Sequence, residues 1–183
     1  MTLSKVTLFE IPSFKYSIPD WEEKKAKLTK MLDSVEYEWH MCSTDFYLSN
    51  GRPPYFDEWY SILEEDLNNV LPNLGLPYYP KEMWHLWSQE YRGNEYHGPH
   101  NHGTAVLSAV LYLDLAPMEH GGTTFYSPFA DFLGTVSDVT VQVDEGDIVF
   151  FPGTLLHEAR PTLSEKMRKI IAFNIPIELF KPC

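Results

Sequence analysis

Histidines gather in the segment EYHGPHNHG, residues 95–103, which contains His97, His100 and His102, three of the seven histidines of the chain. Imidazole is a common metal ligand, and its ordinary pKa lies near neutrality. His100 and His102 are two residues apart and lead into an extended apolar run, and alternate residues of a strand project to the same face. The spacing predicts that both rings approach one metal ion while Asn101 points away.

A third histidine and an arginine follow apolar runs further along the chain. EGDIVFFPGTLLHEARP predicts a strand over Ile148–Phe151, a Pro-Gly turn and then His157. A polar ring in such an apolar setting needs a partner, because burying it unpaired is costly. For His157 alone that partner could be backbone, but His100 and His102 favour metal ligation. Arg168 shares a strand face with Asn174 by parity, and its guanidinium suits bidentate capture of a carboxylate.

Length and charge limit the class of protein. The 183 residues suffice for one domain, and a net charge of -12 repels polyanions, so no nucleic-acid partner is expected. Cys42 and Cys183 give no disulfide framework or thiolate metal site. The N-terminal MTLSKVTLFEIP is no export signal, and no run of 18 apolar residues occurs, so we expect no membrane partner and a cytoplasmic location.

The elements expected around these residues are a few helices followed by many short strands. A strand is predicted over Val6–Ile11, a helix in PDWEEKKAKLTKML with Asp20 as its cap, and a second helix in FDEWYSILEEDLNNVLP. From about Tyr78, short β-type runs alternate with Gly and Pro, which favours a sandwich or barrel. The sequence therefore predicts a mainly β protein of one domain, 1–183, in which residues 1–77 support a β core at 78–183.

Five separated motifs occur in an order typical of one superfamily. They are H-x-H, LSAVLYL, GGTTF, GDIVFFPGTLLH and the R-x5-N strand. Over Trp84–Ile175 the sequence resembles the 2-oxoglutarate/Fe(II)-dependent dioxygenases, and more narrowly the small 2OG-Fe(II) oxygenases of microbial and phage genomes, which are related to the prolyl hydroxylases. The resemblance implies a double-stranded β-helix (a jelly roll, cupin-like) of two facing four-stranded sheets, with the N-terminal helices packed on one sheet.

The resemblance also implies the site. His100, His102 and His157 correspond to the metal ligands, and Arg168 to the arginine that pairs with the C5 carboxylate of 2-oxoglutarate. Strand parity adds Tyr112 and Asn174 as hydrogen-bond partners of this cosubstrate. The cofactors would be Fe(II), 2-oxoglutarate and O2. The implied reaction hydroxylates a C–H bond of a peptide, a protein side chain or a small metabolite and releases succinate and CO2. Oligomeric state is left open.

The second ligand position departs from the superfamily pattern of two histidines and one carboxylate. Since His102 stands there, the site either uses three histidines or recruits a carboxylate such as Asp114 or Glu95, or binding and activity are reduced. Two alternatives stay open: a cupin with a three-histidine dioxygenase site, and a degenerate oxygenase fold that serves as a binding module. His97 is expected beside the ligands, in contact with the substrate or simply in a loop, and His120 in a solvated loop.

Overall fold

The larger of two antiparallel sheets forms the centre of the molecule. The computed structural model describes residues 4, 9–116, 119–162 and 164–178. Seven strands form this sheet in the order β1-β9-β6-β11-β4-β3-β2. Their bounds are β1 Phe14–Ser17, β9 Asp147–Pro152, β6 Val106–Asp114, β11 Arg168–Pro176, β4 His85–Tyr91, β3 Ser43–Thr44 and β2 Glu38–Trp39.

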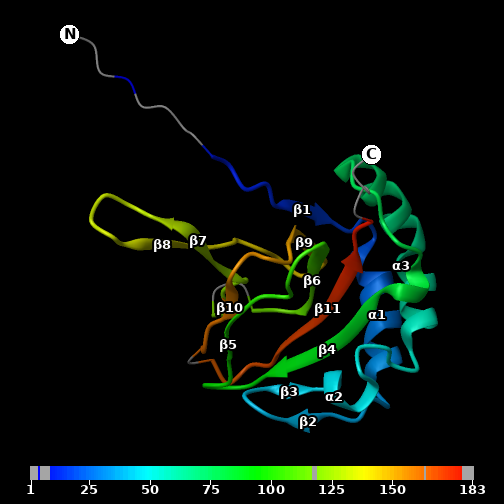
Figure 1. Ribbon diagram of the computed structural model, residues 1–183. Helices are drawn as coiled ribbons and strands as arrows, with labels where there is room; N and C mark the ends of the chain where they lie inside the picture. Colours follow the sequence, from blue (N-terminus) through cyan, green and yellow to red (C-terminus); the bar gives the residue numbers. More distant parts are fainter. Residues whose placement is uncertain (1–3, 5–8, 117–118, 163, 179–183) are drawn as a thin grey trace.

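The smaller sheet has four strands and faces the larger one (Figure 1). Its order is β5-β10-β7-β8. The bounds are β5 His97–His100, β10 His157–Ala159, β7 Thr124–Ala130 and β8 Val136–Thr140. Four consecutive strands of the larger sheet, β9-β6-β11-β4, come from the C-terminal part of the chain and face these four. The described strands therefore confirm the mainly β, double-stranded β-helix fold, with extra strands at both edges of the larger sheet.

The larger sheet is buried on both faces. Successive residues of a strand point to opposite sides, so β11 divides its apolar side chains between two cores. Ile171 and Phe173 belong to the core under the helices, whereas Ile170 and Ala172 belong to the core between the sheets. This second core contains the interior that the histidines and Arg168 border.

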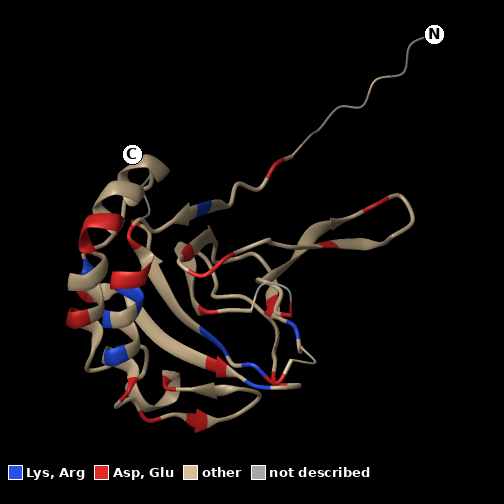
Figure 2. Ribbon diagram, turned by 180° about the vertical axis from the view of Figure 1, so that it is seen from behind, with Lys and Arg blue, Asp and Glu red and all other residues tan. Residues whose placement is uncertain are grey.

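Helices cover the outer face of the larger sheet. The helices on this face are α1 Trp21–Leu32 and α3 Phe56–Val70, and the 3-10 turns are η1 Leu71–Leu74 and η2 Lys81–Met83. The short helix α2 Phe46–Ser49 instead lies at the inner core, where Phe46 contacts Trp87. Trp59, Leu63 and Leu67 of α3 are completely buried, as expected for the apolar stripe of an amphipathic helix. Figure 2 shows many charged positions on these helices and few on the central strands. The two predicted helices are confirmed. Among the described residues, no helix is long and apolar enough to cross a bilayer.

Two predictions about the N-terminal segment are met only in part: residues 9–11 form no strand, and Asp20 occupies the N-cap position without a side-chain cap. Of the strand expected at Val6–Ile11, residues 6–8 lie outside the described residues and residues 9–11 are in no strand. The strand of this region is β1, which pairs with β9. Asp20 precedes α1 but its side chain makes no capping hydrogen bond, because its backbone is left-handed with a φ of 52°. Local pattern located the helix but not its entry geometry.

Candidate metal centre and cosubstrate site

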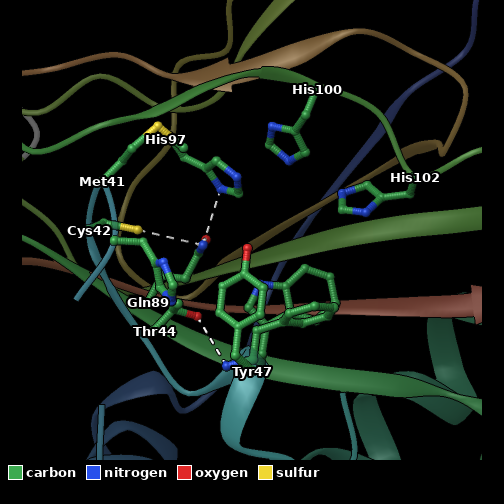
Figure 3. Close-up of a pocket in the computed structure, with 11 residues that line it drawn as sticks. Met41, Cys42, Thr44, Tyr47, Gln89, His97, His100 and His102 are labelled. Atoms are coloured by element: carbon green, nitrogen blue, oxygen red, sulfur yellow. Dashed lines mark hydrogen bonds between the residues drawn. The ribbon is translucent and has the colours of Figure 1, made fainter. Parts of the chain in front are cut away.

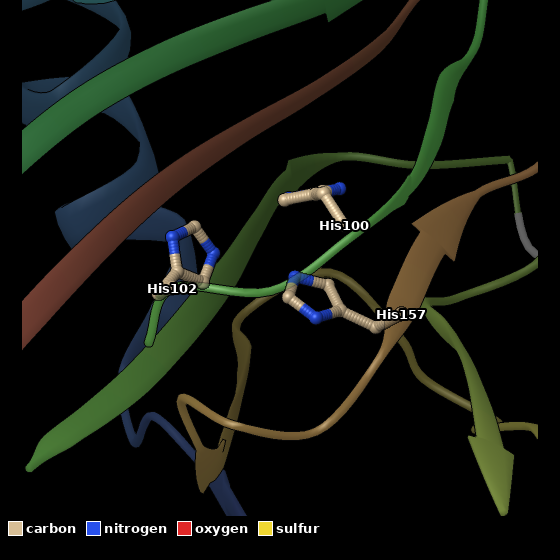
Figure 4. Close-up of side chains that lie close together, drawn as sticks. All are labelled: His100, His102 and His157. Carbon is tan, nitrogen blue, oxygen red and sulfur yellow. The ribbon is translucent and has the colours of Figure 1, made fainter. Parts of the chain in front are cut away.

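Three imidazoles from two separate parts of the chain converge between the sheets. His157 of β10 pairs in register with His100 of β5, and their ring centroids are 4.3 Å apart. The His102 ring lies 5.2 Å from that of His100 and 5.1 Å from that of His157. One nitrogen of each ring lies within 4.8 Å of the others, and Figure 4 shows the three rings grouped around a common space. The structure thus brings together the three histidines that the sequence predicts as metal ligands.

Two of the rings are oriented by backbone carbonyls. The Nδ1 atoms of His100 and His157 lie 2.8 Å from the carbonyl oxygens of Gly98 and Leu155. A carbonyl oxygen only accepts, so each Nδ1 carries the proton and each Nε2 keeps a lone pair. Carbonyl contacts of this kind fix the tautomer of metal-binding histidines. Because both rings keep a free Nε2 lone pair, this set of side chains fits a metal ion.

Burial keeps the rings neutral. It lowers the pKa of His157 to about 3 and that of His102 to about 4, with a smaller contribution from the neighbouring imidazoles. The pKa of His100 is also lowered by burial. Because a protonated imidazole cannot bind a metal, these environments favour the ligand form at neutral pH.

His102 reaches the site by a different route from the one that strand parity predicts. β5 ends at His100, and His102 lies in the following loop. Its backbone N–H donates to the carbonyl of Gly153, 2.8 Å away, which ties this loop to the Pro-Gly turn after β9. The ring is tilted against Trp87, with centroids 5.6 Å apart. The convergence of His100 and His102 therefore depends on a loop contact and not on two positions of one strand.

The two carboxylates considered as replacement ligands are engaged elsewhere. Asp114 pairs with Lys25 at 2.9 Å, and Glu95 accepts a hydrogen bond from the Trp39 indole at 2.9 Å. Neither belongs to the metal-type cluster that the described residues form, which consists of three histidines. Within the described ranges, the arrangement supports the three-histidine alternative.

Arg168 is buried at the start of β11 and only partly partnered. It is 3% exposed, and its guanidinium lies 4.2 Å above the ring of Tyr91. Its Nη1 donates to the carbonyl of Gly121 at 3.1 Å, whereas Nε and Nη2 have no partner among the described residues. A buried cation with two free donors is costly, and a carboxylate is the group that would satisfy it. This residue therefore fits one carboxylate of a dianion such as 2-oxoglutarate.

Tyr112 and Asn174 have protein partners. The Tyr112 hydroxyl shares a 2.8 Å hydrogen bond with the Thr123 hydroxyl and accepts one from the Thr123 N–H at 2.9 Å. The Asn174 side-chain oxygen accepts from the Ser108 hydroxyl at 2.8 Å. Asn174 also borders a cavity of about 30 Å³ that reaches the three histidines, which is room for about one water. Contact of these two residues with the cosubstrate stays a prediction, and a cosubstrate in this cavity requires side chains to move.

The predictions for His97 and His120 have different outcomes. His97 stacks on His100, with centroids 3.9 Å apart, and its Nδ1 lies 3.2 Å from the Gln89 amide nitrogen. It therefore lies beside the candidate ligands, which is one of the three positions expected for it. The solvated loop expected for His120 is wrong, because the ring is 3% exposed and bridges Ala116 N–H and the Lys166 carbonyl. Gln89 was not predicted as a site residue, because a single glutamine within a strand forms no sequence pattern.

The part of the chain that contains these residues matches a known protein family. Residues 85–174 match the family described as "Putative 2OG-Fe(II) oxygenase". Over this range the chain is similar to the 2OG-Fe(II) oxygenases, as the sequence motifs predict. The matched range agrees with the resemblance predicted over Trp84–Ile175. No curated protein sequence matches the chain.

Solved structures of several oxygenases share the fold. A prolyl-4-hydroxylase of Pseudomonas putida has 15% identity and a TM-score of 0.60, covering 92% of this chain and 94% of that chain. HygX of Streptomyces hygroscopicus, solved with nickel and 2-oxoglutarate bound, has 14% identity and a TM-score of 0.63, covering 93% and 85%. The α-ketoglutarate-dependent carbocyclase SnoK from nogalamycin biosynthesis has 15% identity and a TM-score of 0.64, covering 91% and 80%. At these identities the likeness concerns the oxygenase fold.

Proposed function

We propose that the chain is an Fe(II)- and 2-oxoglutarate-dependent dioxygenase that hydroxylates a C–H bond of a peptide, a protein side chain or a small metabolite. The observation that carries the proposal is the pairing of two features inside one β-helix. Three neutral imidazoles converge, and a buried arginine, two of whose donors have no partner among the described residues, stacks on Tyr91 of the core between the sheets. We further propose that residues 1–183 act as one domain, because β1, β2 and β3 extend the sheet that supports the site.

Each residue has a separate role in this proposal. His100, His102 and His157 would hold Fe(II) through ring nitrogens that lie within 4.8 Å of one another. Arg168 binds the far carboxylate of 2-oxoglutarate and fixes its orientation. When bound, Fe(II), 2-oxoglutarate and O2 supply an oxidative decarboxylation that yields succinate and CO2 and places one oxygen atom on the substrate. The apolar core between the sheets excludes bulk water, which limits side reactions.

A binding module is the second candidate, and the histidine set favours it. Three neutral ligands compensate less of the charge of Fe(II) than a set with one carboxylate, which weakens retention of the ion. The two candidates have the same fold and differ in whether the site catalyses a reaction.

The first test adds Fe(II) and 2-oxoglutarate to the chain without oxygen. A weak visible charge-transfer band is expected, because the cosubstrate would bind through its 2-oxo and carboxylate oxygens. Admission of oxygen without a prime substrate should then release succinate slowly. Absence of both signals would refute the oxygenase proposal, whereas a band without succinate would support the binding module.

Arg168→Gln should weaken 2-oxoglutarate binding by about 30-fold or more, because removing one partner of a buried, hydrogen-bonded charge pair costs upward of about 2 kcal/mol. Calorimetric titration of the Ni(II)-loaded chain measures this without turnover. Arg160→Gln is the matched control, since Arg160 is an exposed arginine paired with Glu158 and Asp138. Equal affinity of the wild type and Arg168→Gln would exclude the assigned role of Arg168.

A further inference from the structure

A second cavity opens beside two of the metal-site histidines. It has a volume of about 200 Å³ and is bordered by His100, His102 and by the segment from His40 to Tyr47. That segment contains the β2–β3 turn, β3 and the start of α2. Figure 3 shows Met41, Cys42, Thr44 and Tyr47 on one side of the space and the histidines on the other. A group bound there would therefore lie next to the metal position.

The described wall of this cavity carries no permanently charged side chain, and its titratable residues are histidines, Tyr47 and Cys42. Among the described residues that border it, none is Asp, Glu, Lys or Arg, although the chain as a whole has a charge of -12. The apolar part is mainly aromatic: Phe46 contacts both Trp87 and Tyr47, with ring centroids 5.2 and 5.3 Å apart. The global charge thus says nothing about this site, and the local lining favours uncharged groups.

Two polar groups of the wall are already partnered. The Gln89 amide lies 3.2 Å from His97 Nδ1, and its oxygen accepts from the Tyr91 hydroxyl at 2.8 Å. The Thr44 hydroxyl donates to the Ser88 carbonyl at 3.2 Å. A charged group entering this space would lose its water and find few free partners, which is costly. An apolar or aromatic group would lose little and would gain packing contacts.

The size of the cavity limits what enters it. Pockets that enclose a whole small-molecule ligand commonly measure about 300–1,000 Å³, so a 200 Å³ cavity suits one side chain or one ring. The remainder of a substrate would lie over exposed aromatic residues near the mouth. Trp39 is 70% exposed and Tyr96 is 43% exposed, and the Tyr96 N–H donates to the Met41 carbonyl at 3.1 Å.

We propose that this cavity is the substrate subsite and that it selects an uncharged apolar or aromatic group, of the size of one amino-acid side chain, through the wall formed by His40–Tyr47. The inference rests on the proposed function for the identity of the neighbouring metal centre. It adds a substrate class, and it assigns selectivity to a segment outside residues 85–174, the part that matches the oxygenase family.

The test measures binding of small probes to the chain loaded with Ni(II) and 2-oxoglutarate. The neutral probes are N-acetyl-L-leucinamide and N-acetyl-L-phenylalaninamide, and the charged probes are the corresponding lysine and glutamate amides. Ligand-observed NMR titration should detect the neutral pair and give at least about tenfold weaker binding for the charged pair. A capped Gly-Gly-Leu-Gly-Gly peptide forms a second arm. Binding tighter than that of the leucine amide supports the proposal with a peptide as the source, and equal binding supports it with a free metabolite.

Variants of the wall test which residues select. Tyr47→Ala should weaken binding of the neutral probes about fivefold, because it removes a ring that packs at the cavity. Tyr47→Phe should retain binding. Phe132→Ala is the matched control, since Phe132 is fully exposed on the hairpin between β7 and β8. Met41→Glu should reverse the preference, so that the lysine amide binds better than the leucine amide.

The outcomes separate this inference from the proposed function. Charged probes that bind as tightly as neutral ones, or a Tyr47→Ala variant that binds like the wild type, would overturn the subsite while Ni(II) and 2-oxoglutarate titrations still support the oxygenase. Failure of those two titrations would overturn the proposed function. The probe preference, repeated on the metal-free chain, would then decide whether the cavity still selects neutral groups.

Discussion

His102 would give the proposed metal centre an unusual charge. Superfamily resemblance implies two histidines and one carboxylate, but the three ligand candidates here are neutral imidazoles. Arg168 adds a buried positive charge, and Asp114 and Glu95 are occupied by other partners. A divalent ion would therefore share the interior with a cation and no anionic ligand. A dianionic cosubstrate would compensate the positive charges of the metal ion and of Arg168. Metal and cosubstrate should therefore strengthen each other's binding.

His102→Asp should reduce this coupling. In the wild type we expect 2-oxoglutarate to tighten Ni(II) binding by about tenfold or more, within the usual range of coupling between two ligands. The aspartate variant supplies the anion itself, so it should bind Ni(II) more tightly alone and gain less from 2-oxoglutarate. Calorimetric titration with Ni(II), with and without the cosubstrate, measures both affinities.

The neutral variant His102→Asn controls for the loss of the ring. It should bind Ni(II) weakly and keep a strong dependence on 2-oxoglutarate. An unchanged ratio of affinities in His102→Asp would show that the ligand charge does not control coupling.

The link between β6 and β7 is the element that orders the interior near Arg168. Gly121 supplies the carbonyl that Arg168 contacts, and the neighbouring Gly122 lies against the backbone of Val141. A Cβ at Gly122 would lie 2.3 Å from the Val141 carbonyl oxygen, closer than any real contact. At Gly121 it would lie 3.3 Å from a methyl group of Thr140, which can move. Close packing explains the second glycine of GGTTF.

Gly122→Ala should lower the free energy of unfolding by about 2 kcal/mol, the middle of the range for overpacking, because backbone must shift to admit the methyl group. Gly121→Ala should cost less. Urea unfolding of both variants, followed by circular dichroism, gives the comparison. If the two substitutions cost the same, close approach at Gly122 is not what excludes a side chain there.

For the whole molecule, the N-terminal part completes the sheet that the C-terminal part begins. β1 pairs with β9 at one edge, and β3 pairs with β4 at the other. The Trp59 ring of α3 packs against Phe173 of β11, with centroids 5.0 Å apart. Burial of this face supplies much of the hydrophobic stabilisation available to the larger sheet.

A fragment of residues 78–183 should therefore not fold cooperatively. Without α1 and α3, the outer face of the larger sheet would be exposed as a broad apolar surface, which promotes aggregation. Gel filtration and thermal unfolding, compared with the full chain, test this. A monomeric fragment with a melting temperature like that of the full chain would contradict the one-domain proposal.

Local pattern determined a large part of this protein. The two helices follow from their apolar stripes, the strands after Tyr78 from short β-type runs, and the candidate ligands from His100, His102 and His157 beside apolar segments. These predictions were possible because side-chain periodicity of a strand or helix is written in neighbouring residues. Arg168 also followed from parity along one strand.

The tertiary structure decided which residues come together at the candidate site. The pairing of His157 with His100, the loop contact that brings in His102, and the stacking of His97 join residues whose partners lie on other elements. The wall formed by His40–Tyr47 comes from a part of the chain with no visible motif. Such contacts depend on sheet register and on packing between distant segments, which no local period specifies. The sequence therefore determined the candidate ligands, and the fold decided which residues surround them.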